Sequence, residues 1–196
     1  MTLFDPVLIE GKRVTIRTLA AVDWKDLAHA LLYEGSFHER AFGINTPEKF
    51  KTRYDAALAN IQNRKGQGLV FLSKDESEIY GMTNFMNCEP ENKMTEIGGT
   101  WIAKKWQRTF VNTESKYLLL KYCFEVLKLK RVEFRVMIEN IPSQVAMKRL
   151  GIRLEGILRN RRILPNGESK DYHFYAAIDR DWPTLKPELE ILLAKY

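Results

Sequence analysis

The chain has 196 residues, 45% of them hydrophobic and 29% charged, and it carries a net charge of +6 at neutral pH. These proportions are ordinary for a soluble globular protein. A chain of this length is expected to form one domain over residues 1–196. No apolar run approaches the roughly 20 residues of a membrane-spanning helix, and we expect no signal peptide, because the first residues lack a basic leader.

Cysteine usage and charge distribution narrow the possibilities further. Cys88 and Cys123 lie far apart and match no metal-binding spacing, so we interpret them as reduced thiols of a cytoplasmic protein. Residues 148–170 hold seven basic side chains against two acidic ones, whereas residues 74–96 are mainly acidic. Both runs can be solvated surfaces, or they can form a basic side for a phosphorylated ligand and an acidic side for a cationic one.

Hydrophobic periodicity predicts the elements of the first half of the chain. Alternating apolar residues predict three strands, over residues 13–19, 69–72 and 79–85. Helical spacing predicts two helices between the first and the second of these strands. Asp23 is the expected N-cap of the first helix, and Thr46, followed by Pro47, is the expected N-cap of the second.

The second half of the chain alternates strands and helices. The expected elements are a strand over 96–102 with a bulge at Gly98-Gly99, a helix over 117–127, a strand over 131–138, a helix between Asn140 and Gly151, and a hairpin with its turn at Pro165-Asn166-Gly167. A terminal helix over 183–196 is expected to break near Pro187.

The order of these elements predicts an α+β fold. The strand–helix–strand unit over residues 96–138 implies a parallel strand pair with a right-handed crossover, and the other strands are expected to be mostly antiparallel. The expected architecture is a mixed sheet flanked by helices, a three-layer sandwich, whose central parallel pair splays apart where a ligand enters.

The stretch over residues 106–116 lies between a predicted strand and a strongly apolar helix. A helix that opens after a strand exposes unpaired N–H groups and the positive end of its dipole, which together bind phosphates. Positive charge at its approach comes from Lys104, Lys105 and Arg108. A second helix start, at residues 140–143, follows the next strand, and we expect both starts at the same edge of the sheet.

Several common kinds of site lack their motifs. The sequence contains no Gly-x-x-x-x-Gly-Lys-Ser/Thr loop, no His-Glu-x-x-His zinc motif and no Gly-x-Ser-x-Gly nucleophile elbow. His29, His38 and His173 are scattered, so we expect no metal. A nucleic-acid-binding protein is a weaker alternative, because no reading helix and no interleaving of aromatic and basic residues is evident.

Six segments follow one another in a distinctive order: EIGGTWI (96–102), NTESKYLLL (112–120), RVEFR (131–135), ENIPS (139–143), RLGIRLEG (149–156) and DYHFY (171–175). In their order and spacing they resemble the GNAT superfamily of N-acetyltransferases, and within it the branch of the ribosomal-protein N-terminal acetyltransferases. The resemblance covers nearly the whole chain. It implies acetyl-coenzyme A as the donor, a primary amine as the acceptor and direct transfer between them.

The resemblance also implies where the donor binds. The family seats the diphosphate on a Gln/Arg-x-x-Gly-x-Gly/Ala loop, which here consists of Gln107, Arg108, Thr109, Phe110, Val111 and Asn112. Phe110 and Asn112 replace the two small residues, and we expect Phe110 to hinder close backbone approach and to shift the diphosphate slightly. Further contacts with the donor are expected at Thr100, Trp101, Ile102, Thr113, Asn140, Ser143 and Met147.

Roles in catalysis follow from the same resemblance. Glu96 is the expected base, acting through a water, and backbone N–H groups near Thr100 to Ile102 are expected to stabilise the oxyanion. Many family members protonate the leaving thiolate with a tyrosine, but Met147 stands in its place and cannot donate a proton. Ser143 is the candidate general acid, with Tyr175 or a water as rivals.

The acceptor is left open by the sequence. The family builds its acceptor pocket around the first two helices, where this chain has Trp24, Tyr33, Phe37 and Phe42. The acceptor could be a protein N-terminus, a polyamine or other small amine, or an amino-acid-like antimetabolite. The alternative function is a coenzyme-A-binding regulatory or sensor module with little activity. A monomer and a homodimer are both compatible with the sequence, and no membrane partner is expected.

Overall fold

The structure, a computed structural model, describes residues 2–196, and Met1 lies outside the described part. Within these residues, one eight-stranded sheet has the spatial order β1-β2-β3-β4-β5-β6-β8-β7. The strands are β1 (Leu8–Glu10), β2 (Thr15–Thr18), β3 (Gln67–Leu72), β4 (Ile79–Glu89), β5 (Met94–Ile102), β6 (Arg131–Met137), β7 (Arg153–Ile163) and β8 (Ser169–Ile178). The helices are α1 (Trp24–Leu31), α2 (Phe37–Phe42), α3 (Pro47–Gln62), α4 (Phe110–Lys121), α5 (Ile141–Arg149) and α6 (Trp182–Leu193), with a 3-10 turn η1 (Lys104–Trp106) and a π-helical turn η2 (Tyr122–Val126).

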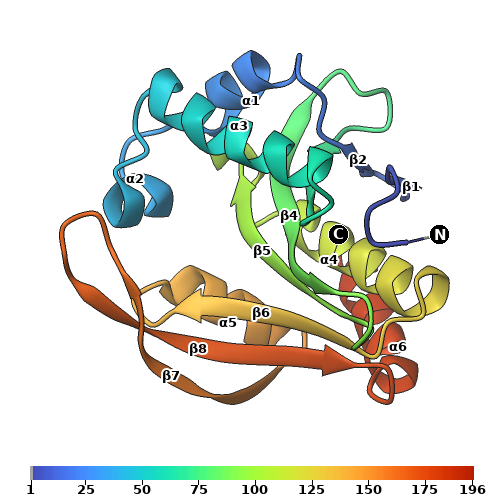
Figure 1. The fold of residues 1–196 in the computed structure, drawn as a ribbon. Coiled ribbons are helices and arrows are strands. Elements are labelled where there is room, and N and C mark those ends of the chain that lie inside the picture. The colour runs from blue at the N-terminus through green and yellow to red at the C-terminus, as the bar shows by residue number, and fades with distance from the viewer. Residues whose placement is uncertain (1) are drawn as a thin grey trace.

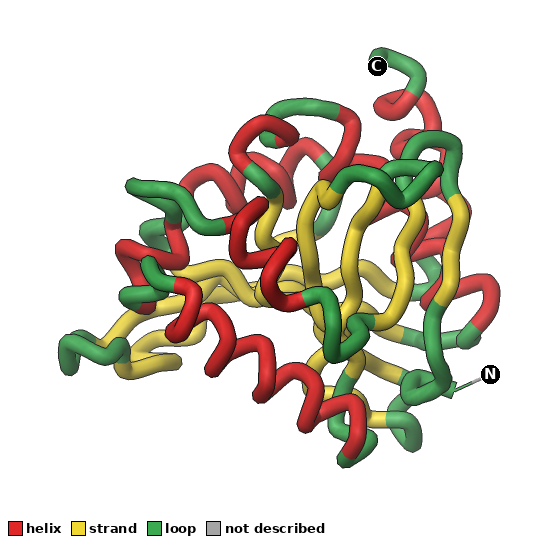
Figure 2. Tube along the Cα trace, turned by 90° about the horizontal axis from the view of Figure 1, so that it is seen from above, coloured by secondary structure: helices red, strands yellow, loops and turns green. Residues whose placement is uncertain are grey.

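Helices cover both faces of the sheet and so make three layers (Figure 1, and Figure 2 from above). On one face, α1 buries Leu27 and Leu31 and α3 buries Phe50 and Tyr54 against β3, β4 and β5. On the other face, α4, α5 and α6 pack against the sheet around a larger core. The spacing of four residues turns one side of α1 and of α3 toward the sheet. The expected α+β fold with a mixed, mostly antiparallel sheet is confirmed.

β5 and β6 form the one parallel pairing within residues 2–196. The ladder ends at the pair Glu96–Glu133, and from there the two strands part. Figure 1 shows β5 and β6 leaving a common corner in different directions. The predicted splay is therefore confirmed. Beyond Glu96, backbone groups of β5 that point toward β6 have no strand partner and can bind a ligand.

Gly98 and Gly99 interrupt β5 directly after this point. The register between β4 and β5 shifts between Met82 and Asn84, and Gly99 adopts a left-handed φ of 62°. A side chain would be strained there, so glycine suits this position. The bulge expected at these glycines is confirmed, and it lies where β5 and β6 have separated.

Some sequence-based expectations were wrong. Asp23 occupies the N-cap of α1, but its carboxylate makes no cap bond and instead accepts hydrogen bonds from Arg17 and the Ala20 N–H. Pro187 lies inside α6 without breaking it. We attribute this to burial of Leu185 and Leu189, which compensates for the hydrogen bond that proline removes. The sequence also missed β1 and α2, both too short for a periodic signal.

Candidate active site

Two helices begin at the edge of the sheet where β5 and β6 end. Thr109 caps α4, and its hydroxyl accepts a hydrogen bond from the Val111 N–H at 3.4 Å. Asn140 caps α5, and its Oδ1 accepts from the Ser143 N–H at 3.3 Å. Because β5 and β6 are parallel, both helix starts lie at the carboxyl ends of these strands. Their free N–H groups and dipoles create a positive potential at the mouth of the gap.

The loop before α4 holds the first positions of the predicted diphosphate pattern. Gln107 Nε2 donates to the Tyr33 hydroxyl at 2.6 Å and to the Ile102 carbonyl at 3.1 Å, which fixes the loop to β5. Arg108 is exposed and adopts a φ of 62°, which is uncommon for a residue other than glycine. Strained backbone of this kind gathers at ligand-binding sites, so it favours a functional role for this loop.

Phe110 is held against the core. The centroid of its ring lies 5.8 Å from that of Tyr80 and 6.0 Å from that of Trp106, both edge-on. The guanidinium carbon of Arg13 lies 4.3 Å from the Phe110 centroid. These three neighbours engage the ring, and the expected shift of the diphosphate stays a prediction.

Four other residues of the predicted donor site have buried side chains, namely Trp101, Val111, Thr113 and Met147. Trp101 stacks on His38 with 4.0 Å between ring centroids, on the α1 and α3 side of the sheet. The Thr113 hydroxyl accepts a hydrogen bond from Arg149 Nη1 at 2.8 Å and so joins α4 to α5. These residues therefore shape the site through backbone and packing.

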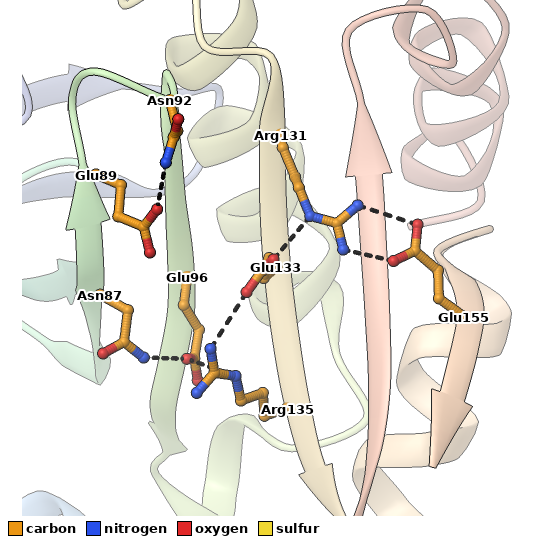
Figure 3. A network of polar contacts seen from close by, with 8 residues as sticks. All are labelled: Asn87, Glu89, Asn92, Glu96, Arg131, Glu133, Arg135 and Glu155. Atoms are coloured by element: carbon orange, nitrogen blue, oxygen red, sulfur yellow. Dashed lines mark hydrogen bonds and ion pairs between the residues drawn. The ribbon is translucent and has the colours of Figure 1, made fainter. Parts of the chain in front are cut away.

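Glu96 lies at the point where β5 and β6 separate, and its side chain is buried. Its Oε2 accepts a hydrogen bond from Asn87 Nδ2 at 2.7 Å and lies 3.2 Å from Arg135 Nε (Figure 3). Burial raises the pKa of Glu96, while the charge of Arg135 and the Asn87 bond oppose this rise. A carboxylate whose pKa is raised toward neutrality is a better proton acceptor than a free surface carboxylate.

Charged side chains continue from Glu96 across the base of the gap (Figure 3). Arg135 also pairs with Glu133 at 3.3 Å, and Arg131 pairs with Glu133 and, through two hydrogen bonds, with Glu155 on β7. Alternating charges stabilise one another in this partly buried setting. The network therefore holds β5, β6 and β7 in place just where β5 and β6 begin to diverge.

Lys116 is a functional candidate that the sequence reading missed. Its side chain is 2% exposed, and its Nζ donates to Thr100 Oγ1 at 2.7 Å and lies 5.9 Å from the centroid of the Phe134 ring. Thr100 belongs to β5 and Phe134 to β6, both past the last ladder pair, so the ammonium reaches the separated parts of both strands. Burial lowers the pKa of Lys116 to about 7. Lys116 comes three residues after Thr113 and four before Leu120, which both lie on the buried face of the helix. This spacing was the signal in the sequence that Lys116 is buried as well.

The two candidate general acids have different surroundings. Ser143 is half-buried in the first turn of α5, beside the cap of the helix. Tyr175 is buried in the core on β8, and its hydroxyl lies 3.4 Å from His173 Nδ1. Burial raises the pKa of the Tyr175 hydroxyl. Neither role is tested by these positions, but Ser143 lies at the edge where both helices begin, as predicted.

The structure brings together only some of the aromatic residues expected around the acceptor. Tyr33 is bonded to Gln107, and Phe37 and Phe42 pack edge-on with 5.9 Å between centroids beside β6 and β8. Trp24 lies apart, in a shallow hollow of about 480 Å³ on the outer side of α1. Arg53 of α3, which the sequence reading missed, lies beside the β5 bulge, because a Cβ atom built on Gly99 would be 2.8 Å from its Nη2.

Membrane-spanning helices and metal-binding clusters are both absent from residues 2–196. No helix among them is long and apolar enough to cross a bilayer. No three or more histidine, cysteine, aspartate or glutamate side chains in this part of the chain gather in a way that could hold a metal ion.

The structure thus combines a mixed sheet that opens between two parallel strands with two helix N-termini at the opening. The family model described as an acetyltransferase (GNAT) domain matches residues 13–153. The chain therefore belongs to the GNAT family, and it is an N-acetyltransferase.

Relatives support the same family and branch. The protein YdaF of Bacillus subtilis (strain 168) is 31% identical over 179 residues, which cover 88% of this chain and 94% of YdaF. The ribosomal-protein-serine acetyltransferase of Escherichia coli (strain K12) is 28% identical over 139 residues, or 69% of this chain and 76% of that one. The crystal structure of a GCN5-related N-acetyltransferase from Brucella melitensis superposes with a TM-score of 0.83 at 26% identity, covering 96% of this chain and 86% of that one.

Proposed function

We propose that this chain transfers an acetyl group directly from acetyl-coenzyme A to a primary amine, on a protein N-terminus or a small molecule. The observation that carries the proposal is the gap between β5 and β6, with the starts of α4 and α5 at its mouth. Two helix N-termini favour the diphosphate, and the unpaired edge of β5 favours the amide-rich arm of the donor. The ribosomal-protein acetyltransferases among the relatives support a protein N-terminus, and the free cysteines Cys88 and Cys123 support a cytoplasmic location.

The donor would lie with its diphosphate on residues 107–113. Arg108 is exposed at this helix start and is free to pair with the diphosphate. We expect Arg108→Ala to weaken coenzyme A binding about tenfold, because a charge-assisted hydrogen bond to phosphate is lost. Isothermal titration calorimetry measures this. Arg108→Gly is the matched control for backbone strain, since glycine accepts the left-handed φ. Equal affinity of Arg108→Ala and wild type would remove Arg108 from the site.

Glu96 would act as the base. An amine is mostly protonated at neutral pH, so it must lose a proton before it attacks the thioester. Glu96 lies at the fork of β5 and β6, and a water bound to its carboxylate can relay the proton. Further along β5, where β6 no longer pairs with it, backbone N–H groups near Thr100 to Ile102 would stabilise the oxyanion of the tetrahedral intermediate.

Lys116 approaches β5 from the face that α4 covers, and there it would stabilise the negative charge that develops during the transfer. The intermediate carries charge first on oxygen and then on the departing sulfur, and a buried ammonium within the gap attracts both. Within residues 2–196, no carboxylate pairs with Lys116, so its charge is not already neutralised. Ser143, at the start of α5, is our candidate for delivering the proton to the thiolate, with Tyr175 or a water as rivals.

The alternative function is a coenzyme-A-binding regulatory module of the same fold. Met147 in place of the family tyrosine, and the altered diphosphate loop, motivate it. Incubation with acetyl-coenzyme A and a panel of amines separates the two functions. The panel includes peptides with free serine or alanine N-termini and small amines. Thiol release that depends on an amine, with an acetylated product in the mass spectrum, is the expected result. Tight binding without amine-dependent release would favour the module.

A further inference from the structure

Arg53 places a guanidinium group against the bulge of β5. A Cβ atom built on Gly99 would lie 2.8 Å from Arg53 Nη2 and 3.0 Å from Asn84 Nδ2. Arg53 comes from α3, so it approaches β5 from the face opposite to Lys116 of α4. Since the donor is proposed to lie toward the start of α4, Arg53 lies on the side left for the acceptor.

The charge of Arg53 is not neutralised within the protein. It is half-buried, and no carboxylate within residues 2–196 forms an ion pair or hydrogen bond with it. Burial and the nearby Arg162 both lower its pKa, which means that its surroundings disfavour the cation. A partly desolvated cation without a counter-ion is costly, and an anionic ligand would offset that cost.

Further arginines gather on the same side. The guanidinium carbon of Arg162, on β7, lies 4.9 Å from the centroid of the Phe42 ring of α2. The charge of Arg161 is near enough to lower the pKa of Glu96. In Figure 1 the β7–β8 hairpin reaches toward α2. The basic run over residues 148–170 therefore contributes to the acceptor side, and not only to a surface for the donor phosphates. His38 adds no charge, because burial, with a smaller effect of Arg53, lowers its pKa to about 3.

Glu96 and Arg53 lie beside neighbouring residues of β5. A Cβ atom built on Gly98 would lie 3.0 Å from Glu96 Oε1, just as one on Gly99 would lie 2.8 Å from Arg53 Nη2. An amine near Glu96 therefore has a guanidinium beside the next residues of the same strand. A carboxylate attached close to that amine could reach Arg53, whereas a second ammonium there would be repelled.

We propose that Arg53 is a specificity residue and that the acceptor is an amine carrying a carboxylate a few bonds from its nitrogen. This inference rests on the proposed function. The carboxylate can be the α-carboxylate of a free amino acid or the side chain of an acidic residue near a peptide N-terminus, since both present the same chemistry. Polyamines are excluded as preferred acceptors by this arrangement of charges.

The test compares matched acceptors that differ only in the carboxylate. One arm uses amino acids and their amides, and the other uses N-terminal peptides with aspartate or asparagine at the second residue. Each is assayed for kcat/KM with wild type, Arg53→Met, Arg53→Lys and the control Arg180→Met, whose arginine is exposed after β8. Calorimetry of the coenzyme-A-loaded protein with the same acceptors gives a readout that is independent of turnover.

We expect the wild type to prefer the carboxylated acceptor of one arm by about tenfold to a hundredfold, as for a charge-assisted bond. Arg53→Met should abolish this preference while changing kcat/KM for the neutral acceptor less than about threefold, Arg53→Lys should retain part of it, and Arg180→Met should change nothing. An equal loss for both acceptors, or a preference for polyamines, would overturn the inference and leave the proposed function standing. Absence of turnover with every amine would overturn both.

Discussion

A Lys116→Met variant is expected to unfold at a higher temperature than the wild type and to turn over more slowly. The ammonium is 2% exposed and has a threonine hydroxyl and an aromatic ring, but no anion, as neighbours. Methionine fills a similar volume without the charge, and Thr100 keeps a hydrogen-bond partner in Thr83, 2.8 Å away. Loss of the charge that faces the oxyanion and the thiolate should lower kcat at least tenfold at pH 7 and below, where the wild-type Lys116 amine is protonated.

The gain in stability should depend on pH in a defined direction. Burial lowers the pKa of Lys116 from 10.5 to about 7, so between these values the unfolded chain holds a proton that the folded chain has lost. Wild-type stability therefore rises from pH 7 to pH 10.5. Lys116→Met should remove this rise, with its advantage largest, about 3 to 5 kcal/mol, at pH 7 and below and vanishing near pH 10.5.

Urea unfolding at pH 6, 8 and 10 measures this effect, and Lys121→Met is the matched control on the same helix, because Lys121 is exposed. The control should match the wild type at every pH. If Lys116→Met were less stable than the wild type at pH 6, the buried charge would not carry the cost that we assign to it. If its kcat were unchanged, Lys116 would have no part in catalysis.

Glu96→Gln is expected to lower kcat/KM by a factor of about 10² to 10⁴, the range for a lost general base. Glutamine has nearly the shape of glutamate but cannot accept the proton. Arg135 keeps Glu133 as a partner at 3.3 Å, so the variant leaves no guanidinium without a counter-ion. Because burial raises the pKa of Glu96, the acidic limb of the wild-type pH profile should lie above the 4.5 of an ordinary glutamate.

The variant should lose that acidic limb, while coenzyme A affinity, measured by calorimetry, stays within about twofold. Glu89→Gln is the control, since Glu89 is exposed at the end of β4 and accepts a hydrogen bond only from Asn92. A Glu96→Gln variant that retained both its rate and its acidic limb would contradict the role of Glu96. A water alone would then accept the proton, or the amine would react in its unprotonated form.

The sequence predicted the elements that create the gap, because their signals are local. The alternation over residues 131–138, the glycines at 98 and 99, and the cap at Asn140 depend on short-range spacing and capping. The helix after β5 was expected over residues 117–127, but α4 begins earlier, at Phe110, because Thr109 caps it. The family resemblance then identified residues 107–112 as the expected loop for the diphosphate of the donor. Local signals failed where tertiary contacts outweighed them, as at Pro187, which packing keeps inside α6.

The sequence by itself determined the framework: the order of strands and helices, the parallel pair and the helix start capped by Asn140, because backbone geometry and hydrophobic period act over a few residues. Only the tertiary structure decided which charges are buried without partners. Lys116 and Arg53 are unremarkable in the sequence. The surroundings of Lys116 come from Thr100 and Phe134, which are 16 and 18 residues away in the chain, and Arg53 lies beside Gly99, which is 46 residues away. Desolvation is a property of the assembled sheet and helices, so these two cations could be found only in the fold.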